Sequence, residues 1–370
     1  MRQEAAQADT HGANNRDAES AAPLSNVTIL DLSTRLPGPL ATLMLAQAGA
    51  RVIRIERPPH GEEMREFKPQ VDGRSAHHRW LNQGKEIRLL DLREAADRTQ
   101  FLELAGEADV LVEQFRPGAM ERLGLGRKAL QHRHPRLIWC SITGYGHADP
   151  RSMQAGHDLN YQADAGLLSL APRDQRGVPV MPAALLGDMV GGSMPAVTNI
   201  LLALMQRTGT GLGGFVDIAM SRNIEFLALW PRITGSLTGQ WPEPLRERHN
   251  GGSPRYNLYL TRDKRVLALG ALEDRFWQNF LEGIALTVPE GLERDDPQAV
   301  IARVAQHLST QDAAYWLEQL KGRDACCNLV RELCDGVGHV SAGPWVPGGP
   351  VCDTRLPLIS LPLCVQPQTP

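Results

Sequence analysis

The chain has 370 residues, of which 42% are hydrophobic and 22% charged, values close to those of ordinary globular proteins. This length favours two domains over one. The 39 Lys and Arg and 42 Asp and Glu give a formal net charge of −3, so no basic excess is available to follow a nucleic-acid backbone. Composition therefore excludes wholesale disorder and disfavours a nucleic-acid-binding role.

Neither a membrane span nor a secretion signal is predicted. The longest uncharged stretch, residues 189–206, contains Gly, Ser, Pro, Thr, Asn and Gln, and its apolar part is too short to cross a bilayer. The N-terminus has no basic region followed by an apolar one. The six cysteines form no CxxC pair and have no histidines at zinc spacing. We therefore expect reduced thiols, no metal site and a cytoplasmic location.

The first elements predict a parallel sheet. Residues 1–24 lack an apolar period and predict a disordered tail. A buried strand follows at 26–33, then a Leu-Pro-Gly-Pro turn, a helix at 40–48 and a second strand at 51–56. A strand, a helix and a strand so close together form a right-handed βαβ unit.

The alternation continues and predicts an α/β large domain at 25–220. Further strands are expected at 85–92, 109–114 and 137–143, and helices at 93–108 and 121–131. This order indicates a doubly wound, Rossmann-like sheet, which binds ligands beyond the carboxyl ends of its strands. The first turn is not GxGxxG, which argues against a dinucleotide dehydrogenase.

The pattern changes near residue 220. Linker helices are expected at 221–254, including one at 224–237, and a smaller α+β domain at 255–345. Within that domain the sequence predicts strands at 256–260 and 265–269 and helices at 273–281 and 298–321. The Pro-rich end, 346–370, is expected to return to the large domain.

Several motifs occur in an order typical of one enzyme family. They are GPLATLMLAQAGARVIRIERP at 38–58, LNQGKEIRLLDL at 81–92, ADVLVEQFRPGAMERLGLG at 108–126, AGHDLNY at 155–161, LLGDMVGGSM at 185–194 and GGSPRYNLY at 251–259. Together they resemble the family III CoA-transferases and their sister enzymes, the α-methylacyl-CoA racemases. The resemblance implies an intertwined homodimer with acyl-CoA bound between one chain's large domain and its partner's small domain. It also implies CoA as part of the substrate, without a separate cofactor.

Three residues are candidates for catalysis. His157, in AGHDLNY, matches the proton-transferring histidine of the racemases, and imidazole titrates near neutrality. Asp188, which alone would be interpreted as a helix cap, matches the nucleophile of the transferases and the second acid/base of the racemases. Glu273 matches the glutamate that pairs with the racemase histidine from the other subunit. Asp158 could orient His157, and Pro195 suggests a helix that starts near Ser193 and leaves Asp188 on a loop.

Five residues are candidates for holding CoA. Arg57 follows the second strand, and a guanidinium fork matches phosphate oxygens, with Lys85 and, less firmly, Arg88 as further cationic groups. Arg116 and Gly118, in FRPG, belong to a loop that lies beside the pantetheine arm in the resembled family. The alternative for Arg57, Lys85 and Arg88 is a solvated surface charge, and the alternative for FRPG is a turn formed by its Pro–Gly pair.

The function predicted is epimerisation of a 2-methylacyl-CoA by removal and return of the proton α to the thioester, with His157 and Asp188 as the two bases. Backbone N–H groups near Asp188 are expected to hold the enolate oxygen. The alternative is CoA transfer through Asp188, because the first loop, RLPGPLATLML, is closer to the transferases. A third possibility is a non-catalytic CoA-binding paralogue, which the short C-terminal region and Pro195 leave open.

Overall fold

The computed structural model describes residues 22–336, 361 and 363, which divide into two compact units. The first holds residues 22–165, 185–224, 361 and 363, and the second holds 166–184 and 225–336. The segment 166–184, which the sequence analysis placed in the large domain, groups with the second unit. Of the expected disordered tail, residues 1–21 lie outside the described residues. Ala22 and Leu24 are buried, so the packed chain begins earlier than predicted.

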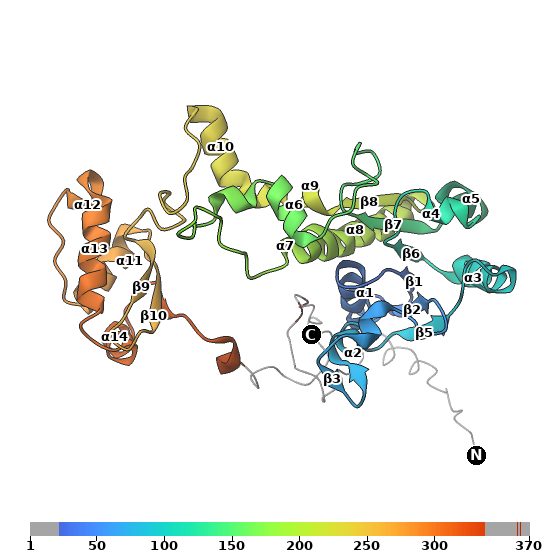
Figure 1. The fold of residues 1–370 in the computed structure, drawn as a ribbon, viewed down its shortest axis with the longest axis horizontal. Helices are drawn as coiled ribbons and strands as arrows, with labels where there is room; N and C mark the ends of the chain where they lie inside the picture. The colour runs from blue at the N-terminus through green and yellow to red at the C-terminus, as the bar shows by residue number, and fades with distance from the viewer. Residues whose placement is uncertain (1–21, 337–360, 362, 364–370) are drawn as a thin grey trace, which may run out of the picture. The chain divides into compact units, whose positions relative to one another are not determined.

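The first unit is built on a six-stranded parallel sheet, which confirms the predicted doubly wound α/β fold (Figure 1). The order is β5 (Glu86–Leu89), β2 (Arg51–Glu56), β1 (Thr28–Leu32), β6 (Val110–Glu113), β7 (Ile138–Thr143), β8 (Phe215–Ala219). Strand β1 pairs with β2 on one side and β6 on the other, so the winding reverses there. Doubly wound sheets bind their ligands at this switch point.

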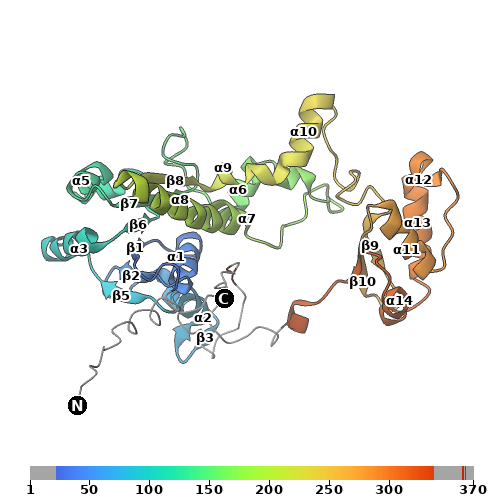
Figure 2. The same ribbon diagram turned by 180° about the vertical axis from the view of Figure 1, so that it is seen from behind.

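Helices cover both faces of this sheet (Figures 1 and 2). Leu30 and Leu111 pack with Phe101 of α3 (Ala95–Glu107) in one buried cluster. On the other face, Asp31 accepts a hydrogen bond from Thr42 of α1 (Pro37–Gln47). Alternate residues of a strand point to opposite faces, so β1 contacts α3 on one face of the sheet and α1 on the other.

Smaller elements complete the first unit. They are β3 (Gln70–Val71), β4 (Arg74–Ser75), α2 (Ala76–Leu81), α4 (Ala119–Arg122), α5 (Arg127–Arg133), α6 (Asp158–Asp164) and α9 (Met220–Asn223). Leu361, inside the segment expected to return to the large domain, is buried against Leu40, Leu43 and Met44 of α1. The rest of that segment, apart from residue 363, lies outside the described residues.

Asp188 belongs to a helix, and the prediction that it lies on a loop is wrong. Helix α7 (Leu186–Asp188) continues through a π-helical turn, Met189–Ser193, into α8 (Met194–Thr210). Pro195 is tolerated because it stands in the first turn of α8. Pro195 has no N–H to donate to the carbonyl of Gly191. This carbonyl instead accepts a hydrogen bond from Asn223 Nδ2 at 2.9 Å.

The combined helix, Leu186–Thr210, is long and apolar enough to span a membrane by length and composition, which the sequence analysis had not predicted for any segment. Its inner side covers β7 and β8, and Gly191 and Ser193 are buried. Its outer side leaves Leu202 and Met205 exposed in the single chain. Such a test is passed equally by the core helices of water-soluble proteins, so it is weak support for a membrane span.

The second unit contains an antiparallel sheet in the order β11 (Cys327–Leu329), β10 (Val266–Gly270), β9 (Tyr256–Leu260). Helices α11 (Asp274–Gly283), α12 (Leu292–Asp295), α13 (Pro297–Leu308) and α14 (Ala313–Leu320) accompany it, and Phe280, Val304 and Trp316 lie in the shared core. This agrees with the α+β architecture predicted for the small domain.

Two predicted helices are divided. The stretch 298–321 forms α13 and α14, since the hydroxyls of Ser309 and Thr310 bond to backbone carbonyls and end the first helix. The stretch 224–237 contains a 3₁₀ turn, Glu225–Ala228, before α10 (Leu229–Thr238). Pro231 lacks the N–H that a helix interior requires, so it stands in the first turn of α10.

Candidate active site

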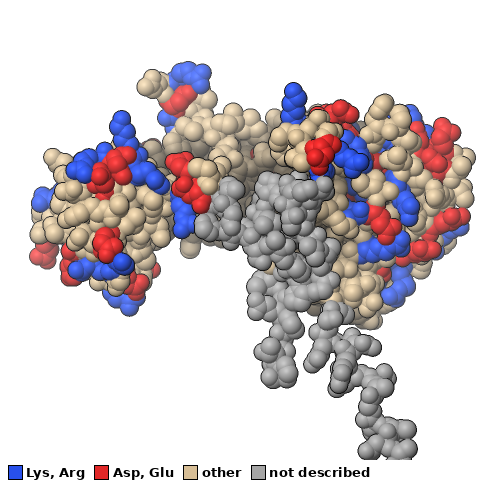
Figure 3. All heavy atoms as spheres, turned by 90° about the horizontal axis from the view of Figure 1, so that it is seen from below, with Lys and Arg blue, Asp and Glu red and all other residues tan. Residues whose placement is uncertain are grey.

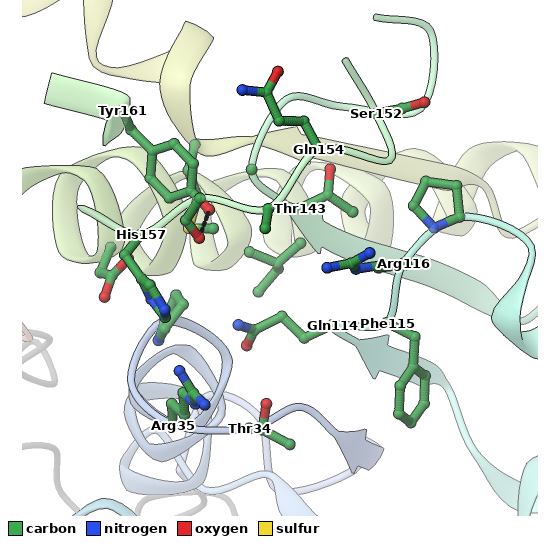
Figure 4. Close-up of a pocket in the computed structure, with 18 residues that line it drawn as sticks. Thr34, Arg35, Gln114, Phe115, Arg116, Thr143, Ser152, Gln154, His157 and Tyr161 are labelled. Atoms are coloured by element: carbon green, nitrogen blue, oxygen red, sulfur yellow. Dashed lines mark hydrogen bonds between the residues drawn. The ribbon is translucent and has the colours of Figure 1, made fainter. Parts of the chain in front are cut away.

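A cavity of about 420 Å³ opens at the switch point of the parallel sheet. Its walls are the segments that follow β1, β6 and β7, together with the start of α6 and the end of α7 (Figure 4). The lining side chains used below are those of Arg35, Gln114, Phe115, Arg116, His157, Tyr161 and Asp188. All of them belong to the first unit. The fold thus brings together two of the three predicted catalytic residues.

His157 caps the N-terminus of α6. Its backbone is extended, and its N–H donates to Asn160 Oδ1 at 3.0 Å, which fixes the main chain at this point. The imidazole lies on the cavity wall in Figure 4, and its side chain also takes part in a capping box with Asn160 at the start of α6. The ring nitrogen that is not engaged there remains available for proton exchange with a bound molecule.

Asp188 lies at the end of α7 and is partly buried. Burial raises the pKa of its carboxyl from 3.8 to about 6, and the nearby carboxylate of Asp158 adds to this rise. Electrostatic interactions with His157 and Arg35 lower the pKa of Asp188 and so offset part of this rise. The carboxyl oxygens have no hydrogen-bond donor among the described residues. A carboxyl that titrates near neutrality can both accept and return a proton.

Asp158 supports Asp188 rather than His157. Its buried carboxylate accepts the backbone N–H of Asp188 at 3.0 Å and the Nε2 of Gln162 at 2.6 Å. No bond to the imidazole occurs among the described residues. A Cβ at Gly187 would meet Asp158 Oδ1 at 3.0 Å, so a larger residue there would press against the carboxylate that holds Asp188.

Tyr161 helps to shape the cavity. Its hydroxyl donates to the carbonyl of Gly156 at 2.7 Å, the dashed contact in Figure 4. Burial raises its pKa to about 12, with a smaller contribution from Asp188. The phenol therefore stays protonated at neutral pH and holds the loop before His157, which is a structural role.

Two of the backbone N–H groups that were predicted to hold the enolate oxygen already donate hydrogen bonds within the chain. The N–H of Asp188 bonds to Asp158, and that of Met189 bonds to the carbonyl of Leu185 at 3.0 Å. The prediction is therefore wrong for these two groups. Gln114 offers another donor, since its Oε1 accepts the N–H of Gly38 at 3.1 Å and its Nε2 has no partner among the described residues.

Adjacent hollows lead from this cavity to Arg57. One, of about 330 Å³, shares Thr34, Arg35 and Phe115 with the catalytic cavity and also includes Arg57. The Arg57 side chain is exposed and lies 3.3 Å from Asp91. Arg116 lines the catalytic cavity and forms no ion pair within the described chain. These two guanidinium groups are accessible to an anionic ligand.

Gly118 lies beside Arg116 in a smaller hollow of about 70 Å³ that also contains His147. It adopts φ +81° at the start of α4, a conformation that favours glycine. His147 bonds through Nε2 to Ser141 Oγ at 2.8 Å. Neither residue lines the catalytic cavity.

Lys85 and Arg88 are placed away from the cavity. The Lys85 side chain has no exposed surface, and its ammonium donates to Asp31, Thr42, Asn82 and the carbonyl of Pro39 at 2.8–3.2 Å. In this structure it cannot reach a phosphate, contrary to the sequence prediction. Arg88 is exposed on β5, 3.5 Å from Glu86.

A buried network of charges surrounds Arg54. The Arg54 guanidinium has no exposed surface and bonds to Asp31 at 3.2 Å, to Glu56 at 3.0 Å and to Glu62. Glu62, Glu56 and His78 lie close enough to hold a metal ion, but their oxygens already accept bonds from Arg54, Arg65 and the backbone N–H of Arg35. The network thus connects the interior of the sheet to the loop that lines the cavity.

Glu273 belongs to the second unit, where it is exposed at the N-terminus of α11. The catalytic cavity is formed without it. Arg35, Gln114 and Tyr161 were not predicted as site residues. The rule that ligands bind beyond strand ends could have indicated Arg35 and Gln114, because Arg35 lies two residues after one predicted strand and Gln114 is the last residue of another.

Comparison with known proteins gives a consistent result. The model of CoA-transferase family III matches residues 24–342. The chain is 32% identical to human (Homo sapiens) α-methylacyl-CoA racemase over 85% of this chain and 80% of that protein. It is 31% identical to the acetyl-CoA:oxalate CoA-transferase of Acetobacter aceti, over 90% of both chains. A CAIB/BAIF family protein from Brucella suis has the same fold, with a TM-score of 0.72 and 24% identity over 85% of each chain.

Proposed function

The chain belongs to CoA-transferase family III, and from this premise we propose that it is an acyl-CoA enzyme that epimerises 2-methylacyl-CoA thioesters. The observation that carries the proposal is that His157 and Asp188 line one cavity, and that the carboxyl oxygens of Asp188 have no hydrogen-bond donor in the described chain. Racemase chemistry needs two such groups, whereas acyl transfer needs only a nucleophilic carboxylate.

The proposed reaction exchanges one proton. One base removes the proton from C2, and the electron pair of the broken C–H bond moves into the thioester carbonyl to give an enolate. Gln114 Nε2 is the proposed donor to the enolate oxygen. The other group then delivers a proton to C2 from the opposite face, and the thioester is restored. Asp188 is suited to either role, because its pKa of about 6 lies near the working pH.

The CoA moiety would extend along the adjacent hollow toward Arg57. A guanidinium there suits a phosphate, and the shared lining residues Thr34 and Phe115 make a continuous path to the thioester position. Arg116 and Gly118 are proposed to lie beside the pantetheine arm. CoA enters as part of the substrate, and no further cofactor is proposed.

We also propose a homodimer in which Glu273 of one chain supports His157 of its partner. The support comes from exposed apolar side chains in both units: Leu202 and Met205 of α8 and Trp230 and Leu237 of α10 are 56–81% exposed. Exposed apolar surface of this kind marks interfaces. A cytoplasmic location is proposed as well, in line with the free thiols of Cys140, Cys326, Cys327 and Cys334.

CoA transfer is the second candidate. The Asp188 carboxylate would attack the donor thioester to form a mixed anhydride and free CoA thiolate. The thiolate would then attack the Asp188 carbonyl of the anhydride, which expels the donor carboxylate and leaves an aspartyl-CoA thioester. An acceptor carboxylate would repeat the two steps in reverse, so that CoA passes to the acceptor and the Asp188 carboxylate is restored. Two observations favour it: the absence of a donor on the Asp188 oxygens within the described chain, and the likeness to the Acetobacter aceti transferase.

One experiment separates these functions. The protein is incubated with (2R)- or (2S)-2-methylacyl-CoA in deuterated water, and C2 is followed by NMR. A racemase introduces deuterium at C2 and equalises the epimers without any acceptor acid. A transferase shows no exchange and yields an Asp188 hydroxamate when hydroxylamine is added. If acyl-CoAs bind but neither product forms, the protein is a non-catalytic CoA-binding paralogue.

A further inference from the structure

The residue before Gln114 is a buried carboxylate that the proposed proton transfer does not use. Glu113 is the last residue of β6, and the Gln114 side chain extends from this strand end into the cavity (Figure 4). Glu113 is only 3% exposed, and it forms no ion pair within the part of the chain that the structure describes. A buried carboxylate without a counterion needs hydrogen-bond donors, and the location of its donors shows what it holds together.

The donors to Glu113 tie the loop after β6 to strand β7. Its Oε2 accepts the backbone N–H of Phe115 at 2.8 Å, and its Oε1 accepts the indole N–H of Trp139 at 3.3 Å. Ser141, which lies opposite Glu113 in the β6–β7 register, donates its hydroxyl as a third bond. Gln114 stands between Glu113 and Phe115, so the carboxylate fixes the backbone on both sides of Gln114.

The Gln114 amide has a second anchor at its other end. Its Oε1 accepts the N–H of Gly38 in α1 at 3.1 Å, which leaves Nε2 as the donor toward the cavity. One anchor on the backbone and one on the amide together define the direction of this donor. Such preorganisation matters for an oxyanion, because a displacement of about 1 Å can cost about two orders of magnitude in rate.

A hydrogen-bonded chain connects Glu113 to solvent. His147 is exposed, and its Nε2 lies 2.8 Å from the hydroxyl oxygen of the fully buried Ser141. When the imidazole is protonated, its Nε2–H donates to Ser141 Oγ, so the hydroxyl proton of Ser141 is directed to the Glu113 carboxylate. Glu113 bonds to the serine rather than to the imidazole, so these three residues do not have the order of a hydrolase triad.

The charge of Glu113 depends on this chain. Burial raises the pKa of the Glu113 carboxyl, whereas its three hydrogen bonds and the charge of His147 lower it in part. Asp217 of β8 accepts the backbone N–H of His147 at 3.0 Å. The other titratable and charged groups near Glu113 are Arg116 of its own loop, Glu121 of α4, Arg127 of α5 and Cys140 of β7. His147 is the group that reaches Glu113 through bonded neighbours.

We propose that Glu113 is a positioning residue that directs Gln114 Nε2 toward the substrate carbonyl, and that His147, through Ser141, holds Glu113 in the charged form that this requires. The inference rests on the proposed acyl-CoA function, with Gln114 as the donor to the thioester oxygen. A neutral carboxyl accepts the N–H of Phe115 more weakly than a carboxylate does, so the turn around Gln114 loosens when Glu113 takes up a proton. As the pH falls, His147 gains its charge and opposes that uptake.

The first test is a double-mutant cycle on deuterium exchange at C2 of 2-methylpropanoyl-CoA. Gln114→Ala should lower kcat about 10²-fold, the usual loss for one oxyanion donor, and Glu113→Gln should lower it about 10-fold. In the Gln114→Ala background, Glu113→Gln should have almost no further effect, because the group that it positions is gone. The dissociation constant of CoA, measured by calorimetry, should not change. If the two losses multiply, Glu113 does not act through Gln114 and the proposal is wrong.

His147→Asn tests the second part of the proposal. His147 is exposed, so this variant should fold even if Glu113→Gln does not. Without the imidazolium, Glu113 takes up its proton at a higher pH, and the acid limb of the kcat profile should therefore move to higher pH. The same substitution should cause no such shift in the Gln114→Ala background. An acid limb that stays in place overturns the role of His147.

A matched control is Asp109→Asn. Asp109 precedes β6 at its opposite end, where its carboxylate accepts the backbone N–H of Thr28 at 2.8 Å and the guanidinium of Arg207 at 2.8 Å. It is therefore another carboxylate that anchors the chain beside β6, but it does not line the cavity. Its kcat and acid limb should equal those of the wild type. A loss as large as that of Glu113→Gln would overturn the proposal.

Infrared spectroscopy separates this inference from the proposed function. The carbonyl band of bound 2-methylpropanoyl-CoA, labelled with carbon-13 at the thioester, falls in frequency when a donor polarises the C=O bond, and this readout needs no turnover. Glu113→Gln should move the band toward its position in Gln114→Ala. If the band moves in this way but neither exchange nor a hydroxamate is found, the positioning role stands and the proposed function fails. An identical band in the wild type and Glu113→Gln overturns the positioning role.

Discussion

The carboxylate of Asp158 accepts the backbone N–H of Asp188 at 3.0 Å, so the residue next to His157 supports the second catalytic candidate. The bond joins the first turn of α6 to α7, two helices that follow different strands. It fixes the main chain of Asp188, and the negative charge of Asp158 also contributes to the raised pKa of the Asp188 carboxyl. One side chain thus determines both the position and the titration of Asp188.

Asp158→Asn should shift the pH dependence of C2 exchange. The amide oxygen can still accept the N–H of Asp188, but the negative charge is lost, so the pKa of the Asp188 carboxyl should fall below its value of about 6. The acid limb of the pH–rate profile should move to lower pH. Gln162→Leu, which removes the other partner of Asp158 and no charge, is the control. An acid limb that does not move would show that another group controls it.

Replacement of His157 should separate proton exchange from binding. His157→Ala should slow C2 exchange by about 10²–10⁴-fold, the usual contribution of a general acid or base. The substitution removes only the side-chain part of the capping box at the start of α6, so the melting temperature should fall only slightly. CoA affinity, measured by calorimetry, should be retained. Normal exchange in this variant would exclude His157 from the chemistry.

Asp188→Asn should abolish exchange and stabilise the fold at neutral pH. The folded-state pKa of about 6 exceeds the ordinary 3.8, so between these values the folded state binds more protons and its stability falls as pH rises. Above pH 6 the ionised group costs roughly 3 kcal/mol, which asparagine avoids. The gain in melting temperature over the wild type should be larger at pH 8 than at pH 4.5. Equal gains at both values would contradict the raised pKa.

Lys85 and Arg57 should give opposite phenotypes. Lys85→Met removes a buried ammonium that serves Asp31 and should cost about 3 kcal/mol of unfolding free energy, measured with urea. Arg57→Ala should leave stability unchanged and weaken CoA binding by about one to two orders of magnitude. If Lys85→Met instead keeps its stability and binds CoA weakly, Lys85 contacts a CoA phosphate, as the sequence analysis predicted.

The proposed dimer can be tested by complementation. His157→Ala and Glu273→Ala chains, co-expressed with different tags and purified as the heterodimer, would contain one site with both residues intact and one with neither. About half of the wild-type exchange activity is expected for a site shared between chains. If both residues of a site come from one chain, each site lacks one of them and activity stays low. Light scattering should show a dimer that persists on dilution.

The alternation of apolar strands and amphipathic helices was sufficient to predict the parallel sheet, because that pattern is local and repeats at each βα unit. The motifs around His157 and Asp188 predicted two catalytic residues, and the structure places both on the wall of one cavity. The placement of Asp188 in a helix depended on Asn223, thirty-five residues away, which satisfies the carbonyl released by Pro195. No pattern in the motif itself contains that contact.

Charged side chains were harder to predict, because their role depends on burial. Lys85 and Arg57 are both cations near strands of the same sheet, and Figure 3 shows Lys and Arg interspersed with Asp and Glu on the surface, as a net charge of −3 suggests. Only the tertiary structure shows that Lys85 is sealed among Asp31, Thr42 and Asn82 while Arg57 faces solvent. Likewise, Arg35 lines the cavity because Glu62, itself bound to Arg54, holds the backbone of its loop. The cavity wall is assembled from the ends of three strands that are far apart in the sequence, so only the tertiary fold brings its residues together.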